Sequence, residues 1–463
     1  MLTNIFSCYL YLLPLQFQQQ TPFINYDHSI FLRFCHSWLE NMTSSSVSQK
    51  LDVTLSLSLS QPRTAHDALK PQERSVKLIQ LLLNCARHAS SGNLQHADDC
   101  LLQISQLASI TGDSMQRLAA RFASALAVRL VKRWPGLYKA LNSSATISCN
   151  LDHARSIFVR KFPCLKFAYA VISRTLIQAM SGEHAIHIID FGSGDPNLWV
   201  PFIKGLGDRK PEPPHLTITC VGRSNQEISR AKLAKEAETL NIPFQFKCVN
   251  VSLQELSLDM LEVQEGEAVA LTSILSLHAL LADENCIDAQ FAVSQHDGKV
   301  KECREMNRFL NMVKSMKPKA MLLVEQEANH NSRRLLDRVV EGLHYYSAIF
   351  DFIDTACGGF LCSDRTALEG MFGKEIENVV AGEERHERHG QWGIRLARAG
   401  LRPIRLWYQT MEEARRVVEG YRPAGFKVVG DEKGSLMICW RDRPIYAVSA
   451  WGCFQPLRNA ADV

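Results

Sequence analysis

The stretch IHIIDFGSGDPNLW, residues Ile186–Trp199, decides the fold. Its first residues form a short apolar run, which is typical of a strand buried in a parallel sheet. Asp190 and the pattern Gly192-x-Gly194 follow at once and predict a tight turn at the carboxyl end of that strand. Small molecules bind at such turns in open α/β sheets. The stretch therefore predicts either a nucleotide-type cofactor site, as in S-adenosylmethionine enzymes, or the same fold without one.

Helical and strand patterns alternate after this turn. Strands are expected at 216–221, 244–249, 268–275 and 320–325, and helices at 200–206, 226–240, 309–316 and 333–350, with a short helix through Leu281. This alternation indicates a Rossmann-like, methyltransferase-like fold: a mostly parallel sheet with helices on both faces. Three short strand patterns at 425–429, 435–440 and 444–451 predict a partly antiparallel edge at the C-terminus.

Helical patterns at 76–89, 94–107, 115–134 and 163–180 precede the first strand. Their apolar stripes should pack against one another and form an N-terminal helical cap. Residues 1–72 are expected to be disordered, with 1–41 an upstream extension and Met42 an alternative start. We therefore expect one domain over 73–455, with the cap mainly in 73–150, the α/β core mainly in 151–455, and a tail at 456–463.

Composition and charge argue against several classes of protein. The 463 residues include 52 basic and 48 acidic side chains, a net charge of +4. This excess is too small to indicate a nucleic-acid groove, and the sequence has no zinc-finger, basic-helix or helix-turn-helix pattern, so direct sequence-specific DNA binding is not expected. The apolar run 5–15 is too short to span a bilayer. The 14 cysteines form no Cys-x-x-Cys pair, and we expect a reducing compartment and no metal site.

The enzyme hypothesis requires a second feature. A methyltransferase also needs an acid at the end of the next strand to hold the ribose hydroxyls. That strand is followed by Gly222-Arg223-Ser224, which places a cation there. Asp190, Gly192 and Gly194 would bind a cofactor only if the alternative function, an S-adenosylmethionine-dependent methyltransferase, holds. Since fold alone does not give function, we expect no enzyme, no catalytic residue and no cofactor.

Five motifs, in order over residues 74–451, resemble the plant GRAS family of transcriptional regulators and most of all its scarecrow-like branch. Residues 78–141 are similar to the first leucine-rich region of the family, and 249–281 to the second. The residues that carry the other motifs are Ile186-His187-Ile188-Ile189-Asp190, Arg385 and Glu387, Trp440, and Ser449-Ala450-Trp451. The chain departs from the family at Pro196–Trp199, where a Gln-Trp pair is usual, and at Thr217, where an Arg is usual.

This resemblance implies a capped methyltransferase-like fold in a transcriptional co-regulator that acts through protein contacts. The implied location is the nucleus, with the cytoplasm as a second location, and the implied role is in gibberellin and developmental signalling. The implied partners are DNA-binding transcription factors of the zinc-finger type and DELLA-type or other GRAS proteins. A scaffold protein without a transcriptional role is a further alternative.

Two leucine patterns are candidate partner-binding motifs. Leu55, Leu57 and Leu59 alternate with serine, which in an extended chain puts them on one side. This strip resembles a plant repression motif that recruits Groucho-like corepressors, and its alternative is chance alternation. Leu78, Leu81 and Leu82 fit a coactivator-type Leu-x-x-Leu-Leu helix, for which packing within the cap is the alternative.

Several histidines and tryptophans have structural interpretations. His187 lies within the apolar strand and is expected to be a hydrogen-bonded core residue. His386 and His389 are spaced to share a helix face, as metal ligands can, but their charged neighbours favour an ion-pair network. Trp440 and Trp451 are expected to pack in the core.

Overall fold

The computed structural model describes residues 70–136, 138–139, 151–192, 194–208, 213–222, 226–282, 303–358, 362–421, 424–432 and 434–453. The chain divides into two compact units, Met1–Gln80 and Leu81–Val463. In the first unit the described residues form the start of helix α3 (Pro71–Ser91), so helix replaces the disorder expected at residues 71 and 72. The rest of the segment expected to be disordered, including Leu55, Leu57 and Leu59, lies outside the described residues, as does the tail at 456–463.

The second unit contains a sheet with the strand order β3-β2-β1-β4-β5-β9-β8-β7, and β6 pairs with β9. Strands β3, β2, β1, β4 and β5 are parallel, and β9 runs antiparallel to β5. This confirms the predicted mostly parallel sheet with an antiparallel C-terminal edge. The strands are β1 (Ala185–Phe191), β2 (His215–Val221), β3 (Phe244–Val249), β4 (Ala268–Ile274), β5 (Ala320–Gln326), β6 (Leu401–Ile404), β7 (Phe426–Gly430), β8 (Leu436–Trp440) and β9 (Arg443–Cys453).

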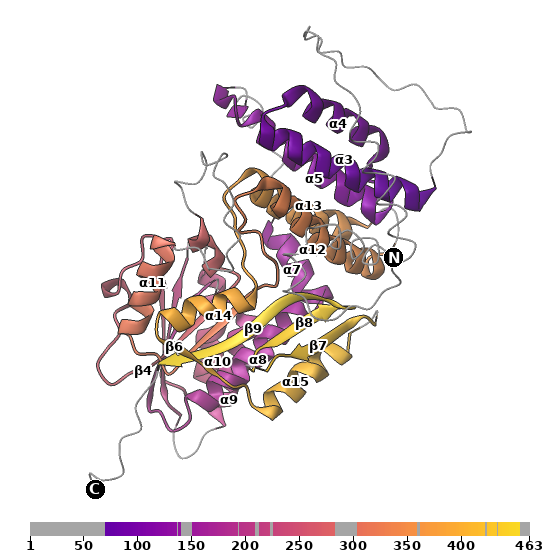
Figure 1. Cartoon of the computed structure of the whole chain (residues 1–463). Coiled ribbons are helices and arrows are strands. Elements are labelled where there is room, and N and C mark those ends of the chain that lie inside the picture. The colour runs from indigo at the N-terminus through magenta and orange to yellow at the C-terminus, as the bar shows by residue number, and fades with distance from the viewer. Residues whose placement is uncertain are drawn as a thin grey trace. The chain divides into compact units, whose positions relative to one another are not determined.

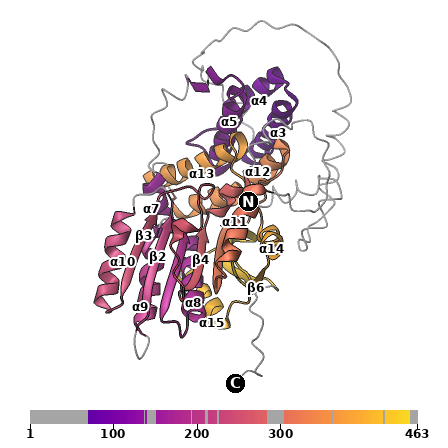
Figure 2. The same cartoon turned by 90° about the vertical axis from the view of Figure 1, so that its left-hand side faces the viewer.

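Helices cover both faces of this sheet (Figure 2). On one face α9 packs against both α8 and α10, and α15 packs against α8. On the other face, α11, α14 and the 3-10 turn η3 enclose an apolar cluster that includes Phe191, Phe309, Trp392 and Trp451. These helices are α8 (Pro163–Ala179), α9 (Pro196–Gly207), α10 (Glu227–Thr239), α11 (Arg304–Ser315), α14 (His389–Arg398), α15 (Tyr408–Glu419) and η3 (Leu277–Leu281).

A separate group of helices draws on both halves of the sequence. Helix α5 packs against α4, α12 and α13, and α7 also packs against α13. Figure 1 shows the orange α12 and α13 beside the indigo α5. The bounds are α4 (Leu94–Leu107), α5 (Ser114–Val131), α7 (Leu151–Lys161), α12 (Leu335–Ala356) and α13 (Ser363–Ala381). The expected cap helices therefore pack against helices that follow the sheet strand β5 in the sequence.

No helix in the described part of the chain combines the length and the apolar character that a bilayer crossing requires.

Candidate functional site

The turn after β1 is organised by the buried carboxylate of Asp190. This side chain accepts hydrogen bonds from the Gly194 backbone N–H (3.1 Å), the Trp199 indole N–H (3.0 Å) and the Thr272 hydroxyl (3.2 Å). Burial raises the pKa of Asp190, although these three donors act in the opposite direction. The carboxylate therefore ties the turn to α9 and to β4.

Backbone conformation and packing explain why position 194 is a glycine. Its φ of +62° lies in the left-handed region that favours glycine, and a Cβ there would approach Cys220 Sγ to 2.8 Å and Phe246 Cζ to 3.4 Å. The chain's own side chains from β2 and β3 thus occupy the space beside this glycine. Arg223, on which the sequence argument against ribose binding depended, lies outside the described residues, as does Ser193.

His187 is a hydrogen-bonded core histidine, as its sequence context predicts. One ring nitrogen lies 2.8 Å from a Glu267 carboxylate oxygen, and the other lies 2.7 Å from the Thr219 hydroxyl. Burial lowers the pKa of His187, against the opposing effect of Glu267. Its neighbours Ile186, Ile188 and Ile189 are also buried, so this motif builds the centre of the sheet.

The closing motif lies on β9 and is mostly buried. The Trp451 indole N–H donates to the Ser449 hydroxyl at 2.9 Å, and Ala450 is also buried. Trp440 on β8 is buried too and donates its indole N–H to Asp351 at 2.7 Å. Both tryptophans therefore pack in the core, as expected. A cavity of about 270 Å³ is lined by Ser449, Ala450 and Trp451 together with polar side chains that include His389 and Asp431.

The motif residues Arg385 and Glu387 make polar contacts, mostly with residues close to them in the sequence. Glu387 accepts two hydrogen bonds from Arg395, at 2.6 and 2.7 Å, and one from Asn331 at 2.7 Å. Arg385 donates to the carbonyl oxygens of Gly382 and Glu384. Glu387 therefore pairs with Arg395 of α14 and not with the charged residues next to it in the sequence.

His386 and His389 do not share a helix face. The possibility that they bind a metal together from one face of a helix is therefore wrong. Helix α14 begins at His389, and His386 lies in the segment before it. His389 contacts Glu327 (3.0 Å) and Asp431 (3.2 Å), whereas His386 lies beside Glu384 (3.3 Å). The two rings therefore belong to different clusters.

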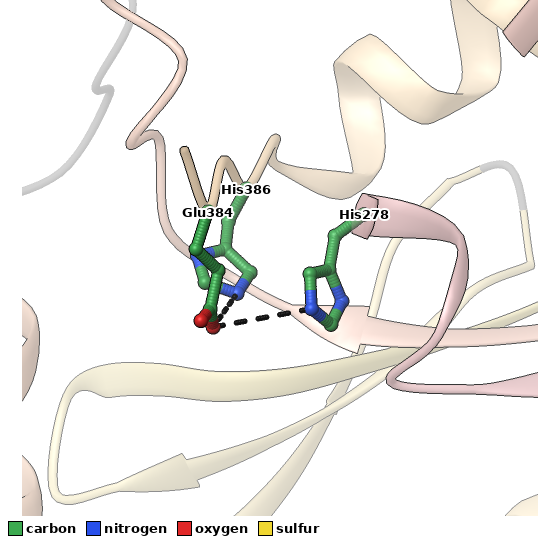
Figure 3. Close-up of side chains that lie close together, drawn as sticks. All are labelled: His278, Glu384 and His386. Atoms are coloured by element: carbon green, nitrogen blue, oxygen red, sulfur yellow. Dashed lines mark ion pairs between the residues drawn. The ribbon is translucent and has the colours of Figure 1, made fainter. Parts of the chain in front are cut away.

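His278, Glu384 and His386 form a cluster that was not expected from the sequence (Figure 3). His278 lies in η3, directly after β4, and the other two lie between α13 and α14. Burial alone would lower the pKa of His278, but the carboxylates of Glu325, Glu384 and Glu375 raise it to about 9. Burial, together with the charge of Glu384, raises the pKa of Glu375 to about 7. These residues are far apart in the sequence. They meet because the parallel sheet brings the carboxyl ends of β4 and β5 together.

The candidate partner-binding leucines of α3 are not on the surface. Leu81 and Leu82 are buried, and so is Leu78, one turn earlier on the same helix face. Other apolar side chains of the first leucine-rich region are exposed: Leu102 to 60%, Ile110 to 69% and Trp134 to 47%. Among the described residues of that region, these are the large apolar side chains most exposed to a partner.

Comparisons with known proteins agree with this architecture. The model of the GRAS domain family matches residues 78–452. Scarecrow-like protein 3 of Arabidopsis thaliana is 37% identical over 475 residues, covering 89% of this chain and 98% of that protein. DELLA protein RGL1 of the same plant is 33% identical, covering 83% of this chain and 71% of that protein. The crystal structure of SCL7 from Oryza sativa matches with a TM-score of 0.67 and 26% identity, covering 81% of this chain and 99% of that one. The chain therefore belongs to the GRAS domain family of plant regulators.

Proposed function

We propose that this chain is a nuclear transcriptional co-regulator that reaches promoters through DNA-binding partners of the zinc-finger type. The proposal includes contacts with DELLA-type or other GRAS proteins, and a role in gibberellin and developmental signalling. The similarity to Scarecrow-like protein 3 and to DELLA protein RGL1 supports both points. Recruitment of a Groucho-like corepressor through Leu55, Leu57 and Leu59 is part of the same proposal.

The observation that carries this proposal is the turn after β1. In an open α/β sheet the crevice for a ligand lies where the strand order reverses, which here is between β1 and β4. At that point Asp190 accepts hydrogen bonds from three groups of its own chain, and Cys220 and Phe246 fill the space beside Gly194. This arrangement supports a sheet that serves as a scaffold for protein contacts.

The first leucine-rich region is our candidate docking surface. Leu102, Ile110 and Trp134 are large apolar side chains that stay in contact with solvent in α4 and beside α5. Burying such groups in a partner's pocket is the usual source of the strongest contributions to binding. We therefore place the contact with a DNA-bound partner on this region.

The test is binding of the purified chain to a zinc-finger transcription factor, measured by titration calorimetry. We expect Leu102→Glu or Trp134→Glu to weaken binding by about tenfold or more, since a buried charge replaces a buried apolar contact. Ile228→Glu is the matched control because Ile228 is also a large exposed apolar residue, but on α10. Equal affinity of all three variants would refute the docking surface.

Because of the glycine-rich turn, an S-adenosylmethionine-dependent methyltransferase is the second candidate function. A binding experiment on the same purified chain distinguishes it from the co-regulator. A titration with S-adenosylmethionine should show no micromolar binding. Micromolar binding that Gly192→Val abolishes would reverse our ranking. We also expect no tight sequence-specific binding of the purified chain to duplex DNA at physiological salt.

A further inference from the structure

We propose that His278, Glu384 and His386 form a zinc site. One potential ligand atom of each residue lies within 4.8 Å of those of the other two. The Nε2 atom of His386 is 3.3 Å from Glu384 Oε1, and the Nε2 atom of His278 is 3.9 Å from the same oxygen (Figure 3). All three side chains thus converge on one point from two segments of the chain.

These separations are close to those of a tetrahedral zinc centre. Zinc lies about 2.0–2.2 Å from nitrogen and oxygen ligands, which places neighbouring ligand atoms about 3.3–3.5 Å apart. The 3.3 Å pair already has this spacing, and the 3.9 Å pair needs a shift of about half an ångström. The ligand atoms of the two histidines lie within 4.8 Å of each other and would have to approach by up to about 1.3 Å. Side-chain rotation alone can supply such a shift.

The ring nitrogens remote from this point are already held. Nδ1 of His278 lies 3.1 Å from Glu325, and Nδ1 of His386 lies 3.0 Å from Nδ1 of His330. A histidine that binds metal through one nitrogen almost always uses the other in a hydrogen bond, most typically to a carboxylate or a carbonyl. His278 and Glu325 reproduce that carboxylate–histidine arrangement, and both Nε2 atoms remain to face the site.

The Nε2 atom of His386 is buried and faces Glu384, the third residue of the cluster. His386 is 1% exposed, and among the described residues its Nε2 has no hydrogen-bond partner although it points toward Glu384. A buried polar atom without a hydrogen bond costs free energy that a bound ion would remove. A metal ion between His386 Nε2 and Glu384 Oε1 would give this buried nitrogen the ligand contact that the present geometry lacks.

The charge and chemistry of the cluster select the ion. The carboxylates of Glu325, Glu375 and Glu384 act on His278, so three acidic groups surround two imidazoles. These carboxylates favour a bound cation at this point. Two imidazoles and one carboxylate are zinc ligands and leave a fourth position for water, whereas calcium and magnesium prefer oxygen ligands throughout.

Such a site would join η3, at the carboxyl edge of the sheet, to the segment between α13 and α14 that carries Arg385 and Glu387. Because zinc would bind the folded chain and not the unfolded one, its binding would stabilise the fold by mass action. The role we infer is therefore that of a structural link between these two segments.

The test uses the full-length chain, freed of metal with a chelator and then titrated with zinc or cobalt. We expect one bound zinc per chain, a higher melting temperature with zinc, and a visible cobalt spectrum of a tetrahedral site. His386→Gln and Glu384→Gln should each weaken zinc binding by about tenfold or more. The matched control is His215→Gln, because His215 is exposed at the start of β2 and should leave zinc binding unchanged.

Two outcomes would overturn the proposal. One is that the parent chain binds no zinc, and the other is that Glu384→Gln and His386→Gln keep the parent's affinity and cobalt spectrum. If a variant fails to fold, which circular dichroism would reveal, the parent's cobalt spectrum decides the question. Thiolate ligands give intense near-ultraviolet charge-transfer bands, so their presence would assign the metal to cysteines and refute this site.

Discussion

At the scale of single residues, the sequence around Asp190 suggests that it binds a cofactor, whereas in the folded chain it holds the turn together. An acid followed by glycines at the end of a strand is the pattern of a cofactor site, and the pattern is present in the sequence. In the folded chain the carboxylate turns inward and accepts three hydrogen bonds from Gly194, Trp199 and Thr272. Sequence could identify the residue but not the direction of its side chain, because two of its donors come from other elements.

Removing this carboxylate should therefore destabilise the fold. We expect Asp190→Ala to lower the free energy of unfolding by about 3 kcal/mol or more, because it leaves three donors buried without an acceptor. Urea unfolding followed by circular dichroism would measure the loss. Asp208→Ala, at the exposed C-cap of α9, is the control and should change stability by about 0.5 kcal/mol or less. A stable Asp190→Ala variant would show that the three hydrogen bonds do not hold the turn.

At the scale of elements, the sequence predicted what depends on local pattern. All the strands of the parallel part and helices α3, α4, α5 and α8 lie within a few residues of their expected positions, except that α3 begins five residues earlier. Their apolar periods are strong and their ends carry Gly, Pro or Asp breakers. Helices α7, α13 and α14 and strand β6 were not foreseen. Helices α7 and α13 are rich in charged residues, α14 contains two glycines, and β6 is only four residues long with a proline.

The candidate sites show the same limit. His187, Trp440 and Trp451 could be placed from their apolar neighbours alone. The cluster of His278, Glu384 and His386 could not, since its members are brought together only by the order of the strands and by the return of the chain after α13. Local spacing instead paired His386 with His389, and the start of α14 between them separates the two.

The contact between α5 and α13 depends on a buried ion pair. Arg117 on α5 lies 2.8 Å from Glu369 on α13 and 2.6 Å from Asp354 on α12. Burial raises the pKa of Glu369 even though Arg117 acts in the opposite direction. Breaking a buried pair leaves one charge uncompensated, at a cost of about 3–5 kcal/mol.

We therefore expect Arg117→Ala to destabilise the chain by about 3–5 kcal/mol in chemical unfolding. The double variant Arg117→Leu with Glu369→Leu should be more stable than the single one, because it buries no unpaired carboxylate. Lys77→Ala, an exposed change on α3, serves as the neutral control. A single variant as stable as the parent would show that the pair contributes nothing to the packing of α5 on α13.

At the scale of the whole molecule, the group of helices around α5 is built from segments that lie before and after the parallel strands in the sequence. Helix α5 precedes β1 in sequence, whereas its partners α12 and α13 follow β5. A division at residue 150 stays a prediction, but it would cut through this packing. Phe122 of α5 contacts Tyr346 of α12 edge to face, with ring centroids 6.3 Å apart, and a Cβ added at Gly342 would lie 3.1 Å from the Phe122 ring.

A fragment of residues 151–463 should consequently fail to fold as an independent domain. Without α4 and α5 it would expose the apolar faces of α12 and α13 and leave Glu369 without Arg117. We expect a broad, non-cooperative thermal transition and rapid proteolysis of α12 and α13 in this fragment, whereas residues 70–463 should unfold cooperatively. If the fragment 151–463 instead unfolds in one sharp transition at the temperature of the longer chain, helices α3, α4 and α5 are not needed for the rest of the chain to fold. In that case partner binding through Leu102 and Trp134 could not be transmitted to the sheet through the packing of α5.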